Sequence, residues 1–242
     1  DNKKLFVIVS NFTNLKERPR GNLLVIDVAT GNVTNKLNID PQAVKVSADG
    51  SKVYVFTPVL DQSGAKLFIL DSNSLRTIKS INLGGIGTFS PITTDRIVLN
   101  SAETVTYVNY QTWDIHYAPK GTTWPEWIDP NDTGLVAVDL VKEKVDKIFY
   151  SKMPAINYHG IALTPDESRL FVSDSSSQTI VVINTSTYEE IARIPVGRSP
   201  SEVKISKNGK YVYVLQMFGS PMTIIDADTY RVIKTVDFSF VH

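Results

Sequence analysis

The stretch "ESRLFVSDSSSQTIVVINTSTYEEIARIPVG", residues 167–197, decides the fold. It contains two short apolar runs, Leu170–Val172 and Ile180–Ile183, and a third, more mixed run that ends at Val196. Short runs rich in β-branched residues and bounded by polar turn residues are typical of β-strands. The stretch therefore predicts three consecutive strands, and the next question is whether the chain repeats them.

The hairpin around Asn184 recurs along the chain. The six copies are "VIDVATGNV" (25–33), "ILDSNSLRTI" (69–78), "YVNYQTWDI" (107–115), "AVDLVKEKV" (137–145), "VINTSTYEEI" (182–191) and "IIDADTYRVI" (224–233). Each places an Asp or Asn after two apolar or aromatic residues, with a Thr, Ser or Lys three residues later: Asp27/Thr30, Asp71/Ser74, Asn109/Thr112, Asp139/Lys142, Asn184/Thr187 and Asp226/Thr229. A short Asp or Asn side chain accepts backbone N–H bonds just ahead of it, which favours a tight hairpin turn.

The spacing of these turns predicts the architecture. They are separated by 44, 38, 30, 45 and 42 residues, and most of these spacings match the roughly 40–45 residues of a four-stranded propeller blade. A second element repeats upstream, because "PQAVKVSADGSKVYVFT" (41–57), "YHGIALTPDESRLFVSD" (158–174) and "PSEVKISKNGKYVYVLQ" (200–216) align without a gap. It predicts an inner strand, a polar turn and a second strand.

The sequence therefore predicts an all-β chain that forms a β-propeller of four-stranded antiparallel blades. We expect one domain over residues 1–242 with six units, at about 1–40, 41–84, 85–119, 120–153, 154–197 and 198–242. The fourth unit is expected to lack a strand, because only 30 residues separate Asn109 from Asp139. The insertion "FTNLKERPRG" (12–21) leaves too few residues for an inner strand in the first unit. A seven-bladed propeller of which this chain is a truncated part is the alternative.

The repeated units resemble a known family. The pattern "SPDG, YVTN, VIDT, VATIPVG" defines the YVTN repeats of surface-layer-like β-propellers, and residues 156–238 look like two consecutive members. The "YVTN" position is held by residues 8–11, 54–57, 171–174 and 213–216. Residues 129–238 are also similar in layout to the β subunit of quinohaemoprotein amine dehydrogenases. The resemblance implies an architecture more than an activity, because propellers host many unrelated functions.

The composition excludes several classes of partner and site. The chain has 25 basic and 25 acidic residues and no cysteine, which argues against a nucleic-acid partner and excludes disulfides and thiolate chemistry. No apolar run is long enough to span a membrane as a helix. Four N-x-S/T sequons, at Asn11, Asn32, Asn131 and Asn184, suit an exported protein. Together with the family resemblance they favour an extracytoplasmic location, in the periplasm or at the cell surface.

Catalytic motifs are missing from the sequence. The three histidines have no neighbours at the spacings that zinc sites use, and no G-x-S-x-G, P-loop or Rossmann glycine pattern occurs. We therefore expect no catalytic residues, metal or cofactor of its own in this chain. The leading hypothesis is a noncatalytic binding or scaffold module for a protein or a glycan. The alternatives are the propeller subunit of an amine dehydrogenase-like complex, whose partner subunit carries the redox cofactor, and a lactonase-like hydrolase.

Three groups of residues are candidates for binding. The aligned starts of the inner strands, which are predicted to meet at one mouth of the central channel, contain Gln42, Lys45, His159, Ser201, Glu202 and Lys204. The segment "GTTWPEWIDPNDTG" (121–134) contains Trp124 and Trp127, which either fill the space of the missing strand or form an aromatic recognition surface. The insertion at 12–21 carries Arg18 and Arg20 and is either a solvated loop or a docking finger for an acidic partner.

Overall fold

The structure of the protein is a computed structural model that describes residues 3–11, 20–57, 65–84, 97–111, 133–150, 158–217 and 221–238. These residues form β-strands, turns and bends, and they contain no helix. The described part of the chain accordingly has no helix long and apolar enough to cross a membrane. The all-β prediction is confirmed.

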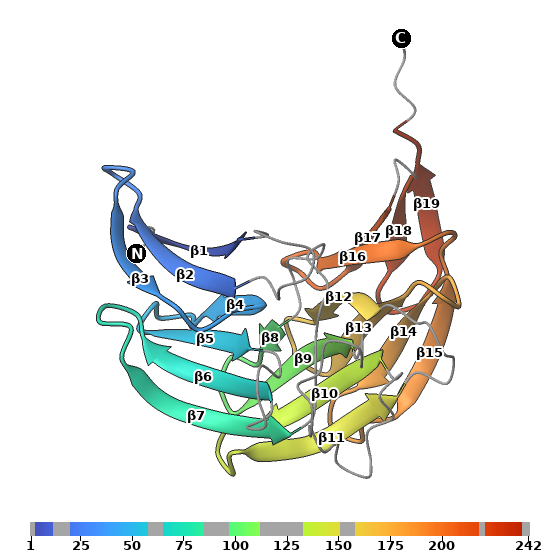
Figure 1. The fold of residues 1–242 in the computed structure, drawn as a ribbon. Helices are drawn as coiled ribbons and strands as arrows, with labels where there is room; N and C mark the ends of the chain where they lie inside the picture. Colours follow the sequence, from blue (N-terminus) through green and yellow to red (C-terminus); the bar gives the residue numbers. More distant parts are fainter. Residues whose placement is uncertain are drawn as a thin grey trace. The chain divides into compact units, whose positions relative to one another are not determined.

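The described strands form five antiparallel sheets, which follow one another along the chain (Figure 1). The first sheet contains β1 (Lys4–Asn11), β2 (Arg20–Asp27) and β3 (Val33–Leu37), and the second contains β4 (Ala43–Val46), β5 (Lys52–Thr57), β6 (Ala65–Asp71) and β7 (Thr77–Gly84). The third contains β8 (Ile97–Leu99), β9 (Val105–Gln111), β10 (Thr133–Asp139) and β11 (Lys144–Tyr150). The fourth contains β12 (Tyr158–Leu163), β13 (Arg169–Asp174), β14 (Thr179–Asn184) and β15 (Glu190–Pro195), and the fifth contains β16 (Pro200–Ile205), β17 (Tyr211–Gln216), β18 (Met222–Asp226) and β19 (Val232–Val236).

The predicted turns are confirmed where the last two strands of a sheet meet. Asp27 accepts hydrogen bonds from the backbone N and the hydroxyl of Thr30, both at 2.8 Å. Asp71 accepts the same pair from Ser74, both at 2.7 Å, and Asp226 accepts them from Thr229 at 2.8 and 2.9 Å. These bonds stabilise the ionised carboxylate and lower the pKa of each aspartate from its ordinary value.

Two backbone irregularities repeat with these turns. The residue four positions after the turn Asp or Asn has a positive φ in every sheet, and it is Gly31, Leu75, Glu143, Tyr188 or Tyr230. The ladder between the last two strands also shifts register close to this turn in the first, second, fourth and fifth sheets, around Thr34, Ile78, Ile191 and Ile233. A register shift of this kind is a β-bulge, which twists the edge of a sheet and discourages pairing with another strand.

The chain divides into two compact units. One is Asp1–Pro91, Thr112–Pro130 and Leu140–Lys144, which includes the first and second sheets, and the other is Ile92–Gln111, Asn131–Asp139 and Val145–His242, which includes most of the third sheet and all of the fourth and fifth. In the first unit, Leu23 and Val25 of β2 pack against Val53 and Val55 of β5. Each unit thus buries the apolar face of one sheet against that of the next.

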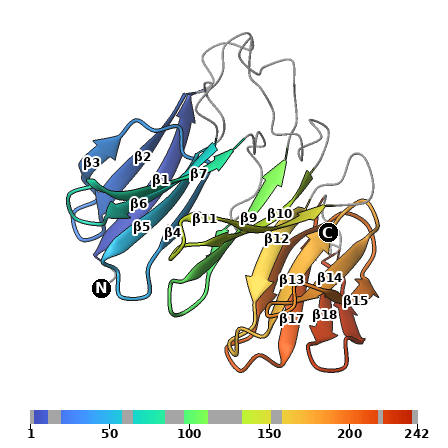
Figure 2. The same cartoon turned by 90° about the horizontal axis from the view of Figure 1, so that it is seen from below.

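In the second unit the fourth and fifth sheets pack face to face (Figure 2). Phe171 and Val182 of the fourth sheet and Val212 and Ile225 of the fifth are all 0% exposed in this core. The hydroxyl of Ser173 strengthens the contact, because it accepts a hydrogen bond from the Gly160 N at 2.8 Å and donates one to the Ser201 carbonyl at 3.0 Å. Buried polar groups of this kind are stable only when they are paired, as here.

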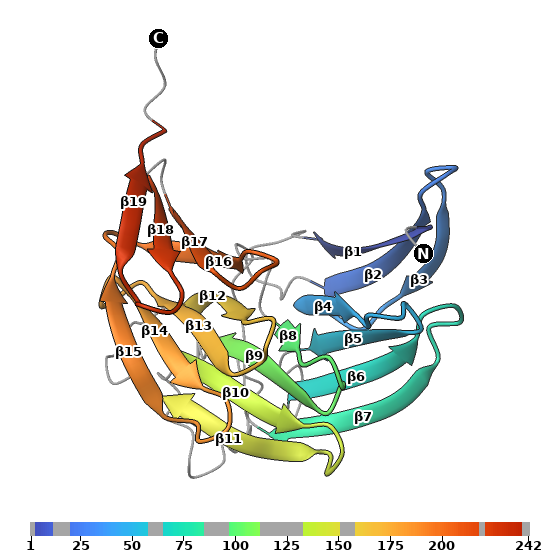
Figure 3. The ribbon, with the colours of Figure 1, turned by 180° about the vertical axis from the view of Figure 1, so that it is seen from behind.

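Two details differ from the predicted repeat. Asn109 does not start a turn, because it lies within β9, is 2% exposed and is paired with Leu135 of β10. The predicted third and fourth units therefore contribute two strands each to one sheet, and the described residues form five sheets where six units were expected. In the described residues the first sheet contains three strands, β1–β3, and β1 forms one edge (Figure 3).

Candidate functional site

The residues predicted at the channel mouth lie in both units. In the first unit, Gln42 precedes β4 and is half-buried, and its backbone N donates to the Phe56 carbonyl at 2.8 Å. Lys45 is exposed on β4 and faces Tyr54 across the ladder to β5. In this unit the position of Gln42 is thus fixed by an ordinary inner-strand hydrogen bond.

In the second unit, the predicted residues lie on two strands that pack together. His159 lies on β12, and its side chain is outside the described residues. Ser201 on β16 is 9% exposed, and its hydroxyl donates a hydrogen bond to the Leu215 carbonyl of β17 at 3.1 Å. This hydroxyl therefore has a structural role, because it helps to join the two strands. Glu202 and Lys204 face Leu215 and Tyr213 across the ladder to β17, so they belong to a face of the fifth sheet.

The other two predicted groups are not described. Trp124, Trp127 and Arg18 lie outside the described residues, and of Arg20 only the backbone is described, as the first residue of β2. The prediction that these residues bind a partner is therefore untested. No group of three His, Cys, Asp or Glu side chains that could hold a metal ion occurs in the described part of the chain.

A hollow that the sequence did not indicate lies between the turns of the fourth and fifth sheets. Its volume is about 440 Å³, and we call it the turn groove. Its polar lining comes from the first turn of each sheet and from the last turn of the fifth, and it contains Thr164, Asp166, Arg169, Asn208, Lys210 and Asp228. Turns of neighbouring sheets therefore form a concave polar surface with charges of both signs.

Arg169 links the two walls of the turn groove. It is the first residue of β13, and its guanidinium donates to the Ala227 carbonyl and, at 3.0 Å, to the Asp228 carboxylate of the fifth sheet. The Tyr230 ring lies 6.0 Å from the Arg169 guanidinium carbon. The Arg169 side chain is 18% exposed and the Asp228 side chain is 74% exposed. The hydrogen bond from Arg169 to the Ala227 carbonyl is therefore better shielded from solvent than the ion pair with Asp228.

Asp166 is held by its own turn. Hydrogen bonds from the hydroxyl of Thr164, from the hydroxyl of Ser168 and from the Ser168 N lower the pKa of Asp166 to about 2. A carboxylate with so low a pKa is a poor proton acceptor at neutral pH, because an efficient general base titrates near the working pH. Asp166 therefore contributes a fixed negative charge to the groove.

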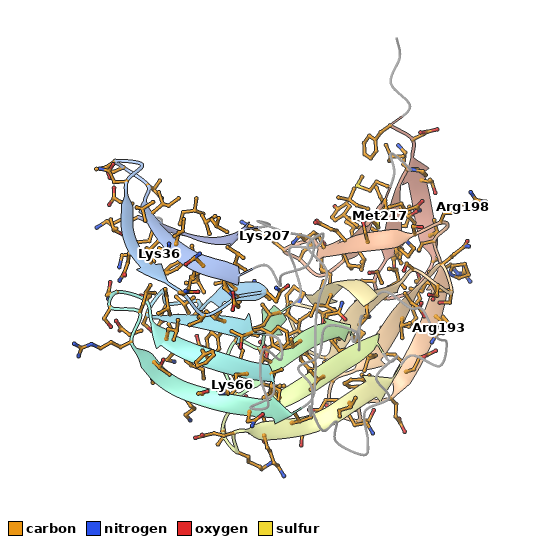
Figure 4. The ribbon with its side chains drawn as sticks, in the orientation of Figure 1. Lys36, Lys66, Arg193, Arg198, Lys207 and Met217 are labelled. Carbon is orange, nitrogen blue, oxygen red and sulfur yellow. The ribbon has the colours of Figure 1, made fainter. Side chains whose placement is uncertain are left out.

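Lys210 supplies a positive charge on the opposite wall. Its ammonium nitrogen lies 5.4 Å from the centre of the Tyr211 ring, and the residue is exposed. Lys207, in the same turn, is also exposed (Figure 4). The groove thus carries the sheltered guanidinium of Arg169 together with the exposed charges of Asp166, Lys210 and Asp228, an arrangement that suits contact with a charged partner surface.

The sequence contained a weak signal for this groove. Arg169 begins the second strand of its repeat, where the aligned residues are Lys52 and Tyr211 and where β1 begins with Lys4. Lys4 makes the equivalent contacts in the first unit, to the Ser72 carbonyl at 3.4 Å and to Asn73 Oδ1 at 2.5 Å. A basic residue at this position thus recurs as a link to the last turn of the next sheet.

Comparison with known proteins identifies the fold. No family model and no curated protein sequence matches the chain. A solved structure, described as the structure of the Dos1 propeller, matches 98% of the chain with a TM-score of 0.63 and 14% sequence identity. The fold is a β-propeller. The chain spans about 56% of the length of the Dos1 propeller chain, and at this identity the likeness shows the fold alone.

Proposed function

We propose that this propeller is a noncatalytic binding or scaffold module of the YVTN-repeat kind, part of an exported or cell-surface protein, and that residues 1–242 act as one domain. Its partner is a protein or a glycan. The observation that carries this proposal is the turn groove, in which Arg169 and Asp166 are bonded to neighbouring protein groups and exposed Lys210 adds a second positive charge. Preorganised charges on rigid turns favour recognition, because little side-chain entropy is lost on binding.

The pKa of Asp166 also argues against a general base at this position in the turn groove. A hydrolase needs a base that titrates near neutral pH, whereas the Asp166 carboxylate of the groove has a pKa of about 2. Asp49, which holds the same place in the first turn of the second sheet, has its pKa lowered by hydrogen bonds from Ser47 and Ser51. Turn carboxylates of this kind stabilise the fold and present fixed charge.

The test is cross-linking of the native complex followed by mass spectrometry. The protein is purified from its source with its bound partners, treated with a lysine-reactive cross-linker and digested. We expect links from Lys207 and Lys210 to one partner chain, and none from Lys36, which lies on the outer strand β3 of the first sheet (Figure 4). The Lys210→Glu variant should lose the partner, while Lys36→Glu should retain it.

Three results would contradict the proposal. Visible absorption from a copurifying haem or quinone subunit would favour the amine dehydrogenase-like alternative. Lactone hydrolysis by the purified chain would favour the hydrolase. A protein that copurifies with neither a chain nor a glycan would exclude a binding module.

A further inference from the structure

Two of the four sequons have an acceptor asparagine whose side chain is described. Asn32, in "NVT", lies in the turn between β2 and β3, and Asn184, in "NTS", begins the turn between β14 and β15. The side chain of Asn11 and the whole of Asn131 are outside the described residues. Because the turns repeat, the position of each described sequon can be compared with the same position in the other sheets.

The sequon at Asn184 is explained by the turn itself. The Asn184 side-chain oxygen accepts hydrogen bonds from the backbone N of Ser186 at 2.9 Å and from the backbone N of Thr187 at 3.0 Å. Asp226 accepts the same pair of backbone bonds in the fifth sheet. Asn184 is half-buried, and short polar residues are favoured at such a turn. This sequon therefore follows from the requirements of the turn.

Asn32, in contrast, holds a position that is exposed in every sheet. It is the fifth residue after Asp27, its carbonyl accepts a hydrogen bond from the Asp27 N at 2.9 Å, and the residue is exposed. In the other four sheets this position carries a long charged side chain, and each of these residues is exposed: Arg76, Lys144, Glu189 and Arg231. Glu189 is exposed even though the fifth sheet covers a face of the fourth. A large group at this position therefore extends into solvent.

The third residue of the sequon also departs from the repeat. The seventh residue after the turn Asp or Asn is an exposed isoleucine in the second, fourth and fifth sheets, namely Ile78, Ile191 and Ile233. In the first sheet it is Thr34, whose hydroxyl donates to the Val25 carbonyl at 3.2 Å. An isoleucine cannot donate such a bond, so three sheets form the same turn without it. Two separate departures, an asparagine for a charged residue and a threonine for an isoleucine, thus create the sequon at Asn32.

We propose that Asn32 is an N-glycosylation site. The modification rests on the proposed export of the chain, and it is independent of the turn groove. The donor is a glycosyl diphosphate. The Asn32 amide nitrogen forms a bond to the anomeric carbon of the sugar, and the bond from that carbon to the phosphate oxygen breaks. The diphosphate leaves with the electron pair of that bond, the amide nitrogen loses one proton to a base, and nothing is oxidised or reduced.

The contacts of the turn indicate when the glycan is added. The motif requires a hydroxyl at its third residue, and in the folded chain the Thr34 hydroxyl is bonded to Val25. We therefore expect the transfer to precede the pairing of β3 with β2. The folded sheet then accommodates the glycan, because the hydrogen bonds of Asn32 in the described part of the chain come from its backbone N and carbonyl.

The test is peptide mapping of the native protein. The protein is purified from its source, digested with trypsin and analysed by mass spectrometry before and after chemical deglycosylation. The tryptic peptide of residues 21–36 contains only the sequon at Asn32, and that of residues 170–193 contains only the sequon at Asn184. We expect the first peptide to carry an added mass that deglycosylation removes, and the second to have its unmodified mass.

Variants produced in the source organism locate the attachment. Asn32→Gln should lose the added mass completely, because it lacks the acceptor. Thr34→Val should also lose it, whereas Thr34→Ser, the matched control, should retain it, since only serine keeps the hydroxyl. A merely structural role of Thr34 would not change the mass of the peptide. An added mass that survives in Asn32→Gln would place the sugar on another residue and overturn the proposal.

Two results for the native protein would also overturn the proposal. One is an unmodified peptide 21–36, and the other is equal modification of both peptides, which would show that the position within the turn has no influence. Cell fractionation separates this proposal from that of export. An unmodified Asn32 in a protein recovered outside the cytoplasm overturns the glycosylation site alone, whereas an unmodified Asn32 in a cytoplasmic protein overturns both.

Discussion

Gly160 on β12 and Ser201 on β16 lie so close that a Cβ atom at position 160 would stand 2.5 Å from the carbonyl oxygen of Ser201. The same Cβ would stand 2.6 Å from the backbone N of Val203. Both neighbours are backbone atoms, which cannot rotate away as a side chain can. The inner strands of the fourth and fifth sheets therefore approach each other at a place that only glycine permits.

We predict that Gly160→Ala lowers the free energy of unfolding by about 3 kcal/mol, since the added methyl group forces the two inner strands apart. Urea denaturation followed by tryptophan fluorescence or circular dichroism measures this change. Gly31→Ala is the matched control, because Gly31 has no atom near its Cβ position but has a φ of +71°. Gly31→Ala should lower the free energy of unfolding by only about 1 kcal/mol, because only the backbone conformation opposes the added methyl group. Equal losses in the two variants would show that the contact at Gly160 relaxes without cost.

Features that depend on neighbouring residues were predictable from the sequence. The turns at Asp27, Asp71 and Asp226 follow from hydrogen bonds that span three residues, so the local pattern is sufficient. Asn109 shows the limit of that pattern. It follows two apolar residues, as the turn residues do, yet it is buried in β9 opposite Leu135, because pairing with a strand more than 20 residues away decides its conformation.

The candidate site was less predictable for the same reason. The alignment of the repeats predicted that Glu202 and Lys204 lie near the start of an inner strand, and the structure has strand β16 at these residues. Which face each side chain takes depends on register with β17, and a register shift between Pro200 and Glu202 sets that register. The turn groove depends on contacts between sheets, such as the one from Arg169 to Asp228, which repeats within one sheet do not reveal.

Arg169 should contribute to stability through its link between the fourth and fifth sheets. We expect Arg169→Ala to lower the free energy of unfolding by about 2 kcal/mol, since it leaves the Ala227 carbonyl without its charged donor. Arg169→Lys should lower the free energy of unfolding by less than half of that amount. A lysine can make such contacts, as Lys4 does in the first unit. Thermal denaturation measures both. If Asp228→Ala cost as much as Arg169→Ala, the exposed ion pair and not the carbonyl contact would be the source of the stability.

Residues with a positive φ offer a test of whether backbone strain or side-chain packing contributes more to the free energy of unfolding at a turn. Gln178 is exposed and has a φ of 58°, so Gln178→Gly should raise the free energy of unfolding by about 1 kcal/mol by removing the left-handed strain. Tyr230 has the same φ, but its ring packs on Phe171 at 6.4 Å between centroids. Tyr230→Gly should therefore destabilise the protein, because the lost packing outweighs the relieved strain. Urea denaturation of the two variants should give shifts of opposite sign.

Acid should weaken the fold through the turn carboxylates. The pKa of Asp166 is about 2 in the folded protein, below its ordinary value of 3.8, so ionised Asp166 stabilises the fold above pH 4. That contribution is lost as the pH falls from about 4 to about 2, because the unfolded chain binds the proton first.

Asp166→Asn should fold, since Asn208 holds the same place in the first turn of the fifth sheet, where its Oδ1 accepts from Ser206 and Lys210. The free energy of unfolding, measured by urea titration at several pH values, should fall less steeply between pH 4 and pH 2 in Asp166→Asn than in the wild type. An unchanged slope would mean that the turn does not prefer the ionised carboxylate.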